Sequence, residues 1–98
     1  MNKLGEQEIA KKLTEVKEWK LTDEKWIERK YRFKDYINGV EFVQKIAHLS
    51  EEANHHPFIS IDYKLVSVKI TSWKAKGLTE LDFQLAEKYD AIYEETKQ

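Results

Sequence analysis

Apolar side chains recur at intervals of three and four residues, which is helical spacing, in three segments of the chain. Asp35 is placed to cap the second segment, and Pro57 ends it because the residue before a proline is pushed out of the α region. Thr79 begins the third segment with a capping-box-like pattern, in which Asp82 is the acidic residue three positions later. The pattern therefore predicts helices over residues 6–16, 35–54 and 79–92.

Alternating apolar and polar positions predict two hairpins between these helices. The first joins residues 19–21 to 26–33 through a polar turn, and the second joins residues 58–63 to 66–73 through a short connection at Lys64. In the last strand the alternation assigns one set of side chains to the core and the other to an open face. We expect Val66, Val68 and Ile70 in the core, and Ser67, Lys69, Thr71 and Trp73 on the open face.

The resulting element order is α-β-β-α-β-β-α. Helices that are interleaved with antiparallel hairpins, instead of alternating with single strands, are typical of the α+β class. With 98 residues and no linker or internal repeat, the chain has room for a single small domain over residues 1–98. We therefore expect a four-stranded antiparallel sheet with three helices on one face.

Charge and composition exclude several classes of function. The formal net charge is -1, from 17 basic and 18 acidic side chains whose signs are interspersed, which argues against direct nucleic-acid binding. Without cysteine, the chain has neither thiolate catalysis nor thiolate metal sites. No apolar run approaches 18 residues, and the first residues do not resemble a signal peptide. We expect a cytoplasmic protein that does not bind membranes.

The densest polar cluster covers residues 51–57, where the second helix turns into a strand, and it contains His55 and His56. Imidazole titrates near neutral pH, so paired histidines at the rim of a sheet could exchange protons with a substrate. Alternatively, His56 and Asn54 cap the helix and satisfy backbone groups before Pro57. A metal site is disfavoured, because adjacent histidines in an extended segment point to opposite sides and no further ligand motif accompanies them.

Other polar and aromatic residues have simpler interpretations. His48 lies on the charged face of its helix and is expected in solvent, and capping alone is enough to explain Asp82. Trp73 is a large indole on the polar side of a strand, which suits either an oligomer contact or a wall on which a flat ligand stacks. Trp19 and Trp26 are expected to pack in and around the first hairpin.

The polar cluster and the residues after it keep the spacing of a family signature, formed here by Glu51, His55, His56, Pro57, Tyr63, Trp73 and Asp82. In this spacing the chain resembles the pterin-4a-carbinolamine dehydratases, also called 4a-hydroxytetrahydrobiopterin dehydratases. Trp19, residues 31–36 and residues 77–79 extend the resemblance over nearly the whole chain. The ordered set is more specific than a lone histidine pair.

The resemblance implies a lyase that removes water from 4a-hydroxytetrahydropterin and so recycles the pterin of aromatic amino-acid hydroxylases. It implies that His55 is the general acid and base, that His56 binds the pterin and takes part in proton transfer, and that Glu51 orients an imidazole or holds the pterin. No metal or organic cofactor is expected, because the pterin is the substrate. The further substrate-binding residues that the resemblance implies are Pro57, Trp73 and Trp19.

Two departures and one alternative accompany the resemblance. Many family members have a third histidine where this chain has Trp73, and an indole cannot protonate a leaving hydroxyl. Asn54 stands where an aspartate is frequent, which removes a charge that could orient an imidazole. Because some members of the family stabilise the dimer of a transcription factor, the alternative is a non-catalytic binding module for a partner protein. A homodimer or homotetramer is expected in either case.

Overall fold

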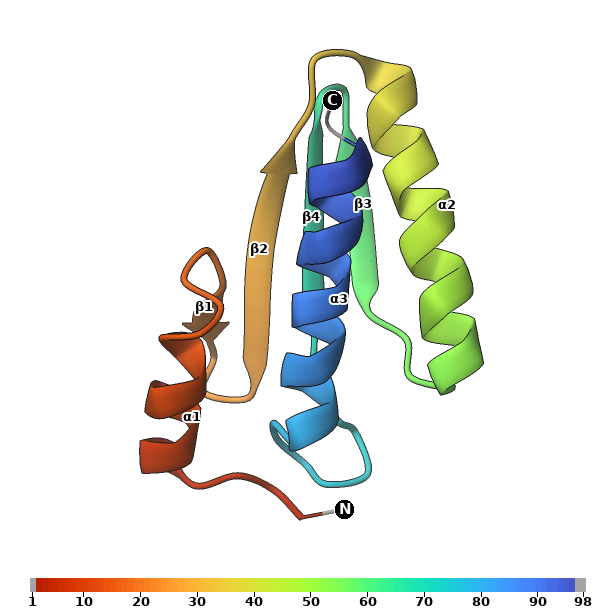
Figure 1. Ribbon diagram of the computed structural model, residues 1–98. Coiled ribbons are helices and arrows are strands. Elements are labelled where there is room, and N and C mark those ends of the chain that lie inside the picture. The colour runs from red at the N-terminus through yellow and green to blue at the C-terminus, as the bar shows by residue number, and fades with distance from the viewer. Residues whose placement is uncertain (1, 97–98) are drawn as a thin grey trace.

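The computed structural model describes residues 2–96, and it confirms the order α-β-β-α-β-β-α (Figure 1). Asp35 caps the second helix as predicted, by accepting a hydrogen bond from the backbone N–H of Asn38 at 2.8 Å. The elements are α1 (Glu6–Leu13), β1 (Lys20–Thr22), β2 (Trp26–Arg32), α2 (Tyr36–Ala53), β3 (Phe58–Asp62), β4 (Leu65–Ile70) and α3 (Glu80–Thr96).

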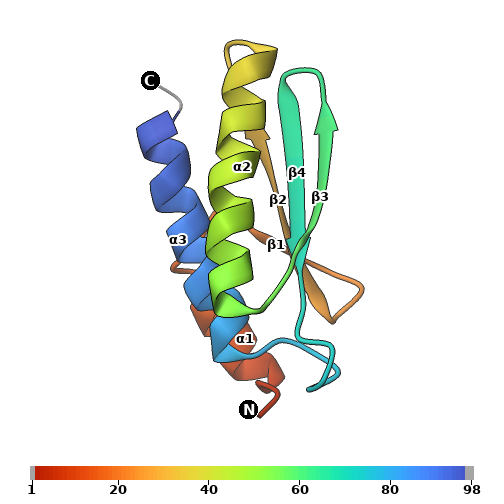
Figure 2. The same ribbon diagram turned by 90° about the vertical axis from the view of Figure 1, so that its right-hand side faces the viewer.

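The four strands form one antiparallel sheet in the order β1-β2-β4-β3, so that the strands of the second hairpin lie beside β2. Figure 2 shows the helices gathered on one side of this sheet, with α2 and α3 next to each other. The α+β class and the single layer of helices are therefore as predicted. This arrangement brings the end of α2 close to the start of α3, although these two segments are far apart in the sequence.

The core lies between the sheet and the helices. The predicted inward set of β4, Val66, Val68 and Ile70, is fully buried. On β2, Ile27 and Tyr31 pair with Ile70 and Val66 and are fully buried as well. Side chains from all three helices close the other side of the core: Ile9, Phe42, Ile46, Phe83, Leu85, Ala86 and Tyr89.

The first helix is shorter than the sequence predicts. It ends at Leu13, and Thr14 caps it through a hydroxyl that donates to the carbonyl of Lys11 at 2.6 Å. Val16 continues the apolar stripe but lies in the turn after the helix, where it is still buried. The apolar periodicity therefore predicted correctly that Val16 is buried, but its prediction of where the first helix ends was wrong.

The last strand also ends early, at Ile70 instead of Trp73. Thr71 is buried, and its hydroxyl donates to the carbonyl of Lys25 in the turn between β1 and β2. The prediction that Thr71 lies on the open face is therefore wrong. Strand alternation holds only while the backbone stays extended, and beyond Ile70 the chain enters a turn.

A buried pair of hydroxyls joins α2 to α3 beneath the polar cluster. The Ser50 hydroxyl lies 2.6 Å from the hydroxyl of Tyr89, and it also donates to the carbonyl of Ile46. Burial raises the pKa of Tyr89 to about 12, and the charge of Asp82 contributes in the same direction. The neutral phenol is thus favoured in the folded state.

Alkali is therefore expected to destabilise the fold through Tyr89. An unfolded tyrosine ionises near pH 10, so the stability contributed by the neutral phenol is fully present below pH 10 and is lost as the pH rises towards 12. We expect Tyr89 to account for a fall of about 2–3 kcal/mol in the free energy of unfolding across this window. Urea unfolding at several pH values measures this fall in the free energy of unfolding. The fall should be smaller for Tyr89→Phe than for Tyr63→Phe, which changes an exposed tyrosine as a control. Equal falls in the two variants would contradict the role given to Tyr89.

Candidate active site

The end of α2 sets the direction of the two histidines. Asn54 follows the last helical residue in the left-handed conformation, with φ 52° and ψ 44°, which asparagine tolerates better than most residues. The backbone N–H of His55 then donates to the carbonyl of Ser50 at 3.0 Å, closing the helix end. The capping role considered for Asn54 is confirmed, and it turns the chain so that His55 and His56 lie at the junction with β3.

His55 points towards the start of α3, where it meets Asp82. Its Nε2 lies 2.7 Å from Oδ1 of Asp82, a carboxylate that is fully buried. An ionised carboxylate can only accept, so Nε2 carries the proton and donates, and in the neutral ring Nδ1 holds the lone pair. The imidazole is itself mostly buried, with 15% of its side-chain surface exposed. The pair fixes both the tautomer and the orientation of His55.

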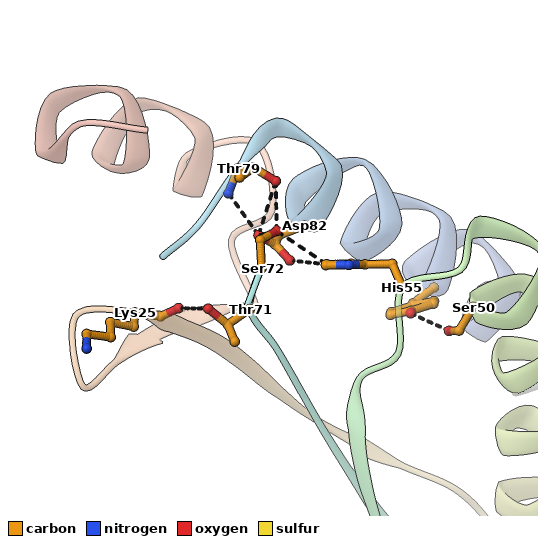
Figure 3. A network of polar contacts seen from close by, with 8 residues as sticks. Lys25, Ser50, His55, Thr71, Ser72, Thr79 and Asp82 are labelled. Atoms are coloured by element: carbon orange, nitrogen blue, oxygen red, sulfur yellow. Dashed lines mark hydrogen bonds and ion pairs between the residues drawn. The ribbon is translucent and has the colours of Figure 1, made fainter. Parts of the chain in front are cut away.

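Two further residues, Ser72 and Thr79, contact the Asp82 carboxylate (Figure 3). Oδ2 accepts from the Ser72 hydroxyl at 2.7 Å and from the backbone N–H of Thr79 at 2.8 Å. The Ser72 hydroxyl lies 2.8 Å from that of Thr79 and 3.4 Å from Nε2 of His55. The predicted cap of α3 therefore exists, but capping is not the whole role of Asp82, since the same carboxylate also holds a histidine.

His56 makes a second carboxylate pair, on the surface. Its Nε2 lies 2.7 Å from Oε1 of Glu51, five residues earlier in α2. Both side chains are exposed, so this pair positions the ring more than it stabilises the fold. In both histidines Nε2 is held by a carboxylate.

A cleft of about 760 Å³ opens beside this network. One wall is aromatic: Trp73, 62% exposed, contacts Trp26 with ring centroids 5.1 Å apart and Phe58 with centroids 6.1 Å apart. The prediction that Trp73 lies off the core is thus confirmed, although it sits in a turn and not in the strand. The cleft is lined by Asn54, His55, His56, Pro57, Phe58, Ser72, Trp73, Lys74, Ala75, Thr79 and Leu81.

Most of the residues singled out from the sequence meet at this cleft. His55, His56, Pro57 and Trp73 line it, and Glu51 borders it through its bond to His56. His48 is exposed on α2 and is not among the lining residues. The cleft therefore combines two imidazole rings with an exposed aromatic surface, which are groups suited to proton exchange with a flat ligand.

Trp19 is placed elsewhere. It is 2% exposed, and its indole N–H donates to both carboxylate oxygens of Asp90, at 3.0 and 3.2 Å. Its ring packs against Tyr31 and Tyr89 in the core, and it does not line the cleft. The packing role expected from the residues alone therefore describes Trp19 better than the substrate contact that the resemblance implied.

Sequence reasoning missed Ser72, and it gave Thr79 and Asp82 too small a role by treating them only as a helix cap. Asp82 had a signal, because it belongs to the spaced set of residues in the family signature, but capping alone accounts for an acidic residue at this position. Ser72 offered no signal besides its place before Trp73, whereas Thr79 marked a helix start and belonged to the segment 77–79 that extends the family resemblance. Their convergence on one carboxylate depends on the packing of α3 against the end of β4.

Neither a metal cluster nor a membrane span is found within residues 2–96. In this range, no group of three or more histidine, cysteine, aspartate and glutamate side chains is arranged to hold a metal ion. Within the same residues, no helix has both the length and the apolar character needed to cross a membrane.

Comparison with known proteins decides the family. The family model described as pterin 4 alpha carbinolamine dehydratase matches residues 2–92, which is most of the chain. The chain belongs to the pterin-4a-carbinolamine dehydratase family. The features that matched its signature, from the two histidines to Asp82, all lie within the matched residues.

Relatives within the dehydratase family match over nearly their full length. A protein of Picosynechococcus sp. is 40% identical over 90 residues, which cover 92% of this chain and 97% of the relative. A protein of Sulfurisphaera tokodaii is 38% identical over 92 residues, covering 94% and 98%. Both are named "Putative pterin-4-alpha-carbinolamine dehydratase".

Solved structures agree with the fold. The crystal structure of a Brucella melitensis protein described as "transcriptional coactivator/pterin dehydratase" superposes with a TM-score of 0.90 at 32% identity and covers 94% of this chain and 99% of its own. A pterin dehydratase-like protein identified as a RuBisCO assembly factor in the alpha-carboxysome has a TM-score of 0.66 at 22% identity, with coverage of 76% and 91%. The second likeness concerns the fold alone.

Proposed function

We propose that this chain dehydrates pterin-4a-carbinolamine to quinonoid dihydropterin and water, returning the pterin to aromatic amino-acid hydroxylases. One observation carries the proposal: the His55 imidazole is fixed by the buried Asp82 carboxylate at a cleft that also holds His56 and an aromatic wall. Membership of the dehydratase family supports the same reaction. Pro57 and Trp73 line the space proposed for the flat ring.

The reaction is an elimination that needs one proton donated and one removed. Carbon 4a carries a hydroxyl group and the N5 amine. Protonation of the hydroxyl lets it leave as water while the N5 lone pair forms the C=N bond, and loss of the N5 proton completes the step. His55 and His56 are the proposed proton carriers, through Nδ1 of each ring, because Nε2 is already bonded to Asp82 or Glu51.

The proposed chemistry needs no cofactor besides the pterin substrate. Oxidation states are unchanged overall, since one molecule of water is removed and no electrons are transferred. Imidazole side chains in general can both donate and accept a proton near neutral pH. The residues that the proposal assigns to the pterin are Glu51, His55, His56, Pro57 and Trp73.

A stopped-flow assay of freshly generated carbinolamine tests the proposal. The purified chain is expected to accelerate dehydration over buffer, and the rate should be unchanged after dialysis against a chelator. Folded protein that leaves the buffer rate unaltered would refute the proposal. Loss of activity in chelator and recovery with one metal would overturn the cofactor-free mechanism.

A non-catalytic role with a partner protein is the second candidate. It is favoured by the likeness to the Brucella melitensis protein, which is described as a transcriptional coactivator as well as a pterin dehydratase. In this role the chain would stabilise the dimer of a partner, and loss of His55 would leave partner binding intact. Analytical sedimentation of the chain alone tests the expected homodimer or homotetramer. The expected cellular compartment is the cytoplasm.

Trp73 is expected to make the enzyme selective between the two 4a-hydroxy stereoisomers. The indole can stack on the pterin but cannot protonate a hydroxyl, so the isomer whose hydroxyl points towards this wall should react more slowly. Trp73→His should narrow the difference between the isomers. Because Trp73 is 62% exposed, the cost in stability should stay below about 1 kcal/mol.

Single-isomer kinetics on the parent and Trp73→His, with thermal unfolding, measure both effects. Tyr36→His is a suitable control, since Tyr36 is also an exposed aromatic residue and does not line the cleft. Equal rates for both isomers in the parent protein would remove the argument for selectivity.

A further inference from the structure

We infer that Ser72 is a positioning residue. Its hydroxyl fixes the rotation of the Asp82 carboxylate, and this carboxylate in turn orients the His55 ring at the cleft. This inference rests on the proposed function and adds a residue that the family signature in the sequence did not include. Ser72 is 7% exposed, and it follows the end of β4 by two residues. It therefore acts from the segment after β4 on a carboxylate that belongs to α3.

The two oxygens of Asp82 have different partners. Oδ1 receives the Nε2–H of His55, and Oδ2 receives the Ser72 hydroxyl and the Thr79 backbone N–H. A carboxylate on a single bond is free to rotate unless its second oxygen is held. Two donors on Oδ2, one from the strand end and one from the helix start, fix the rotation and so fix the place of Oδ1.

The Ser72 hydroxyl is better placed than the Thr79 hydroxyl to donate a hydrogen bond to Oδ2 of Asp82. The Thr79 hydroxyl lies 3.5 Å from Oδ2, at the limit of a hydrogen bond, whereas the Ser72 hydroxyl lies at 2.7 Å. With Ser72 donating to Asp82, its oxygen can accept from the Thr79 hydroxyl at 2.8 Å. The directions of all these bonds are then consistent, because each hydroxyl donates once and the carboxylate only accepts.

Ser72 also holds the turn that carries the aromatic wall. Its backbone exchanges hydrogen bonds with Gly77, at 3.2 and 3.4 Å, and these close the turn that contains Trp73. One residue thus connects the turn of Trp73 to the carboxylate that orients His55. The spacing between the proton-transferring ring and the wall depends on this connection, and small errors in such spacing are costly in catalysis.

The test compares three variants of the full chain. Ser72→Ala should lower kcat for the carbinolamine by about 10-fold, and Ser72→Thr, which keeps the hydroxyl, should recover most of the loss. Thr71→Val is the matched control: Thr71 is the adjacent buried hydroxyl, but it bonds to the Lys25 carbonyl, apart from the Asp82 network (Figure 3). The kcat of Thr71→Val should stay near that of the parent, even if its melting temperature falls as much as that of Ser72→Ala.

A second measurement separates this inference from the proposed function. Nitrogen chemical shifts of the His55 ring, measured without substrate, should report the Nε2–H tautomer in the parent and in Ser72→Thr, and a mixture of tautomers in Ser72→Ala. A parent that does not dehydrate the carbinolamine refutes the proposed function but leaves this readout valid. A parent-like tautomer in Ser72→Ala, or an equal loss of kcat in Ser72→Ala and Ser72→Thr, would overturn the positioning role.

Discussion

Replacing His55 by alanine is expected to lower kcat/KM for the carbinolamine by about 100-fold or more, the contribution typical of one general acid–base group. The His55 imidazole is the more buried of the two rings that line the cleft, and Asp82 holds it in one tautomer. Water can reach the vacated space but has neither the fixed position nor the suitable proton affinity of the ring. The loss should therefore appear chiefly in kcat.

His48→Ala provides the matched control. His48 is an exposed histidine on α2, about two turns before the histidine pair, and is not among the residues lining the cleft. Its kinetics should equal those of the parent, and far-UV circular dichroism should show all three proteins folded. Parent-like kinetics in a folded His55→Ala protein would exclude His55 from the mechanism and shift the proton transfer to His56.

Asp82→Asn is expected to have an effect of similar size, about 100-fold in kcat/KM, for a different reason. The Ser72 hydroxyl and the Thr79 N–H both need an acceptor, so the amide oxygen should take the place of Oδ2. The amide nitrogen then faces Nε2 of His55 and donates to it. The ring must carry its proton on Nδ1 instead, and the nitrogen proposed to face the substrate loses its lone pair.

The substitution is nearly isosteric, so the fold should survive and the effect can be assigned to the tautomer. Ring nitrogen shifts of His55 in Asp82→Asn should move from the Nε2–H to the Nδ1–H pattern. Asp62→Asn, which changes an exposed aspartate at the end of β3, is the control for the loss of one negative charge. An Asp82→Asn enzyme with the parent tautomer and the parent rate would show that Asp82 serves only as the cap of α3.

The two predictions also distinguish catalysis from the partner-binding alternative. A module that only stabilises a partner's dimer should tolerate Asp82→Asn and His55→Ala at the cleft, provided that both fold. An enzyme should lose its rate in both while its melting temperature changes little. The comparison therefore needs activity, partner binding and stability measured on the same preparations.

Hydrophobic periodicity was enough to predict the elements and the inner face of the sheet. Val66, Val68 and Ile70 alternate with polar neighbours and are fully buried, because a strand presents successive side chains to opposite faces. The order of helices and hairpins followed from similar patterns, and the histidine pair was placed correctly at the end of α2. These features depend on short stretches of chain, and their physical causes are local.

The ends of elements and the contacts between them could not be obtained in this way. Thr71 is buried because the strand stops at Ile70 and the turn of the first hairpin supplies a carbonyl at that place. Trp19 is in the core because Asp90, 71 residues later, accepts its indole N–H. In both cases the deciding partner lies in another element, and no spacing along the sequence reports it.

The candidate site shows the same division. The sequence by itself determined which residues can exchange protons, since imidazole is the side chain suited to it near neutral pH. Only the tertiary structure decided how His55 is oriented, because Asp82 lies 27 residues away and reaches it when α3 packs beside the end of α2. Burial then makes the contact effective: a carboxylate shielded from water, with Ser72 and Thr79 on its second oxygen, holds one tautomer of the ring in place.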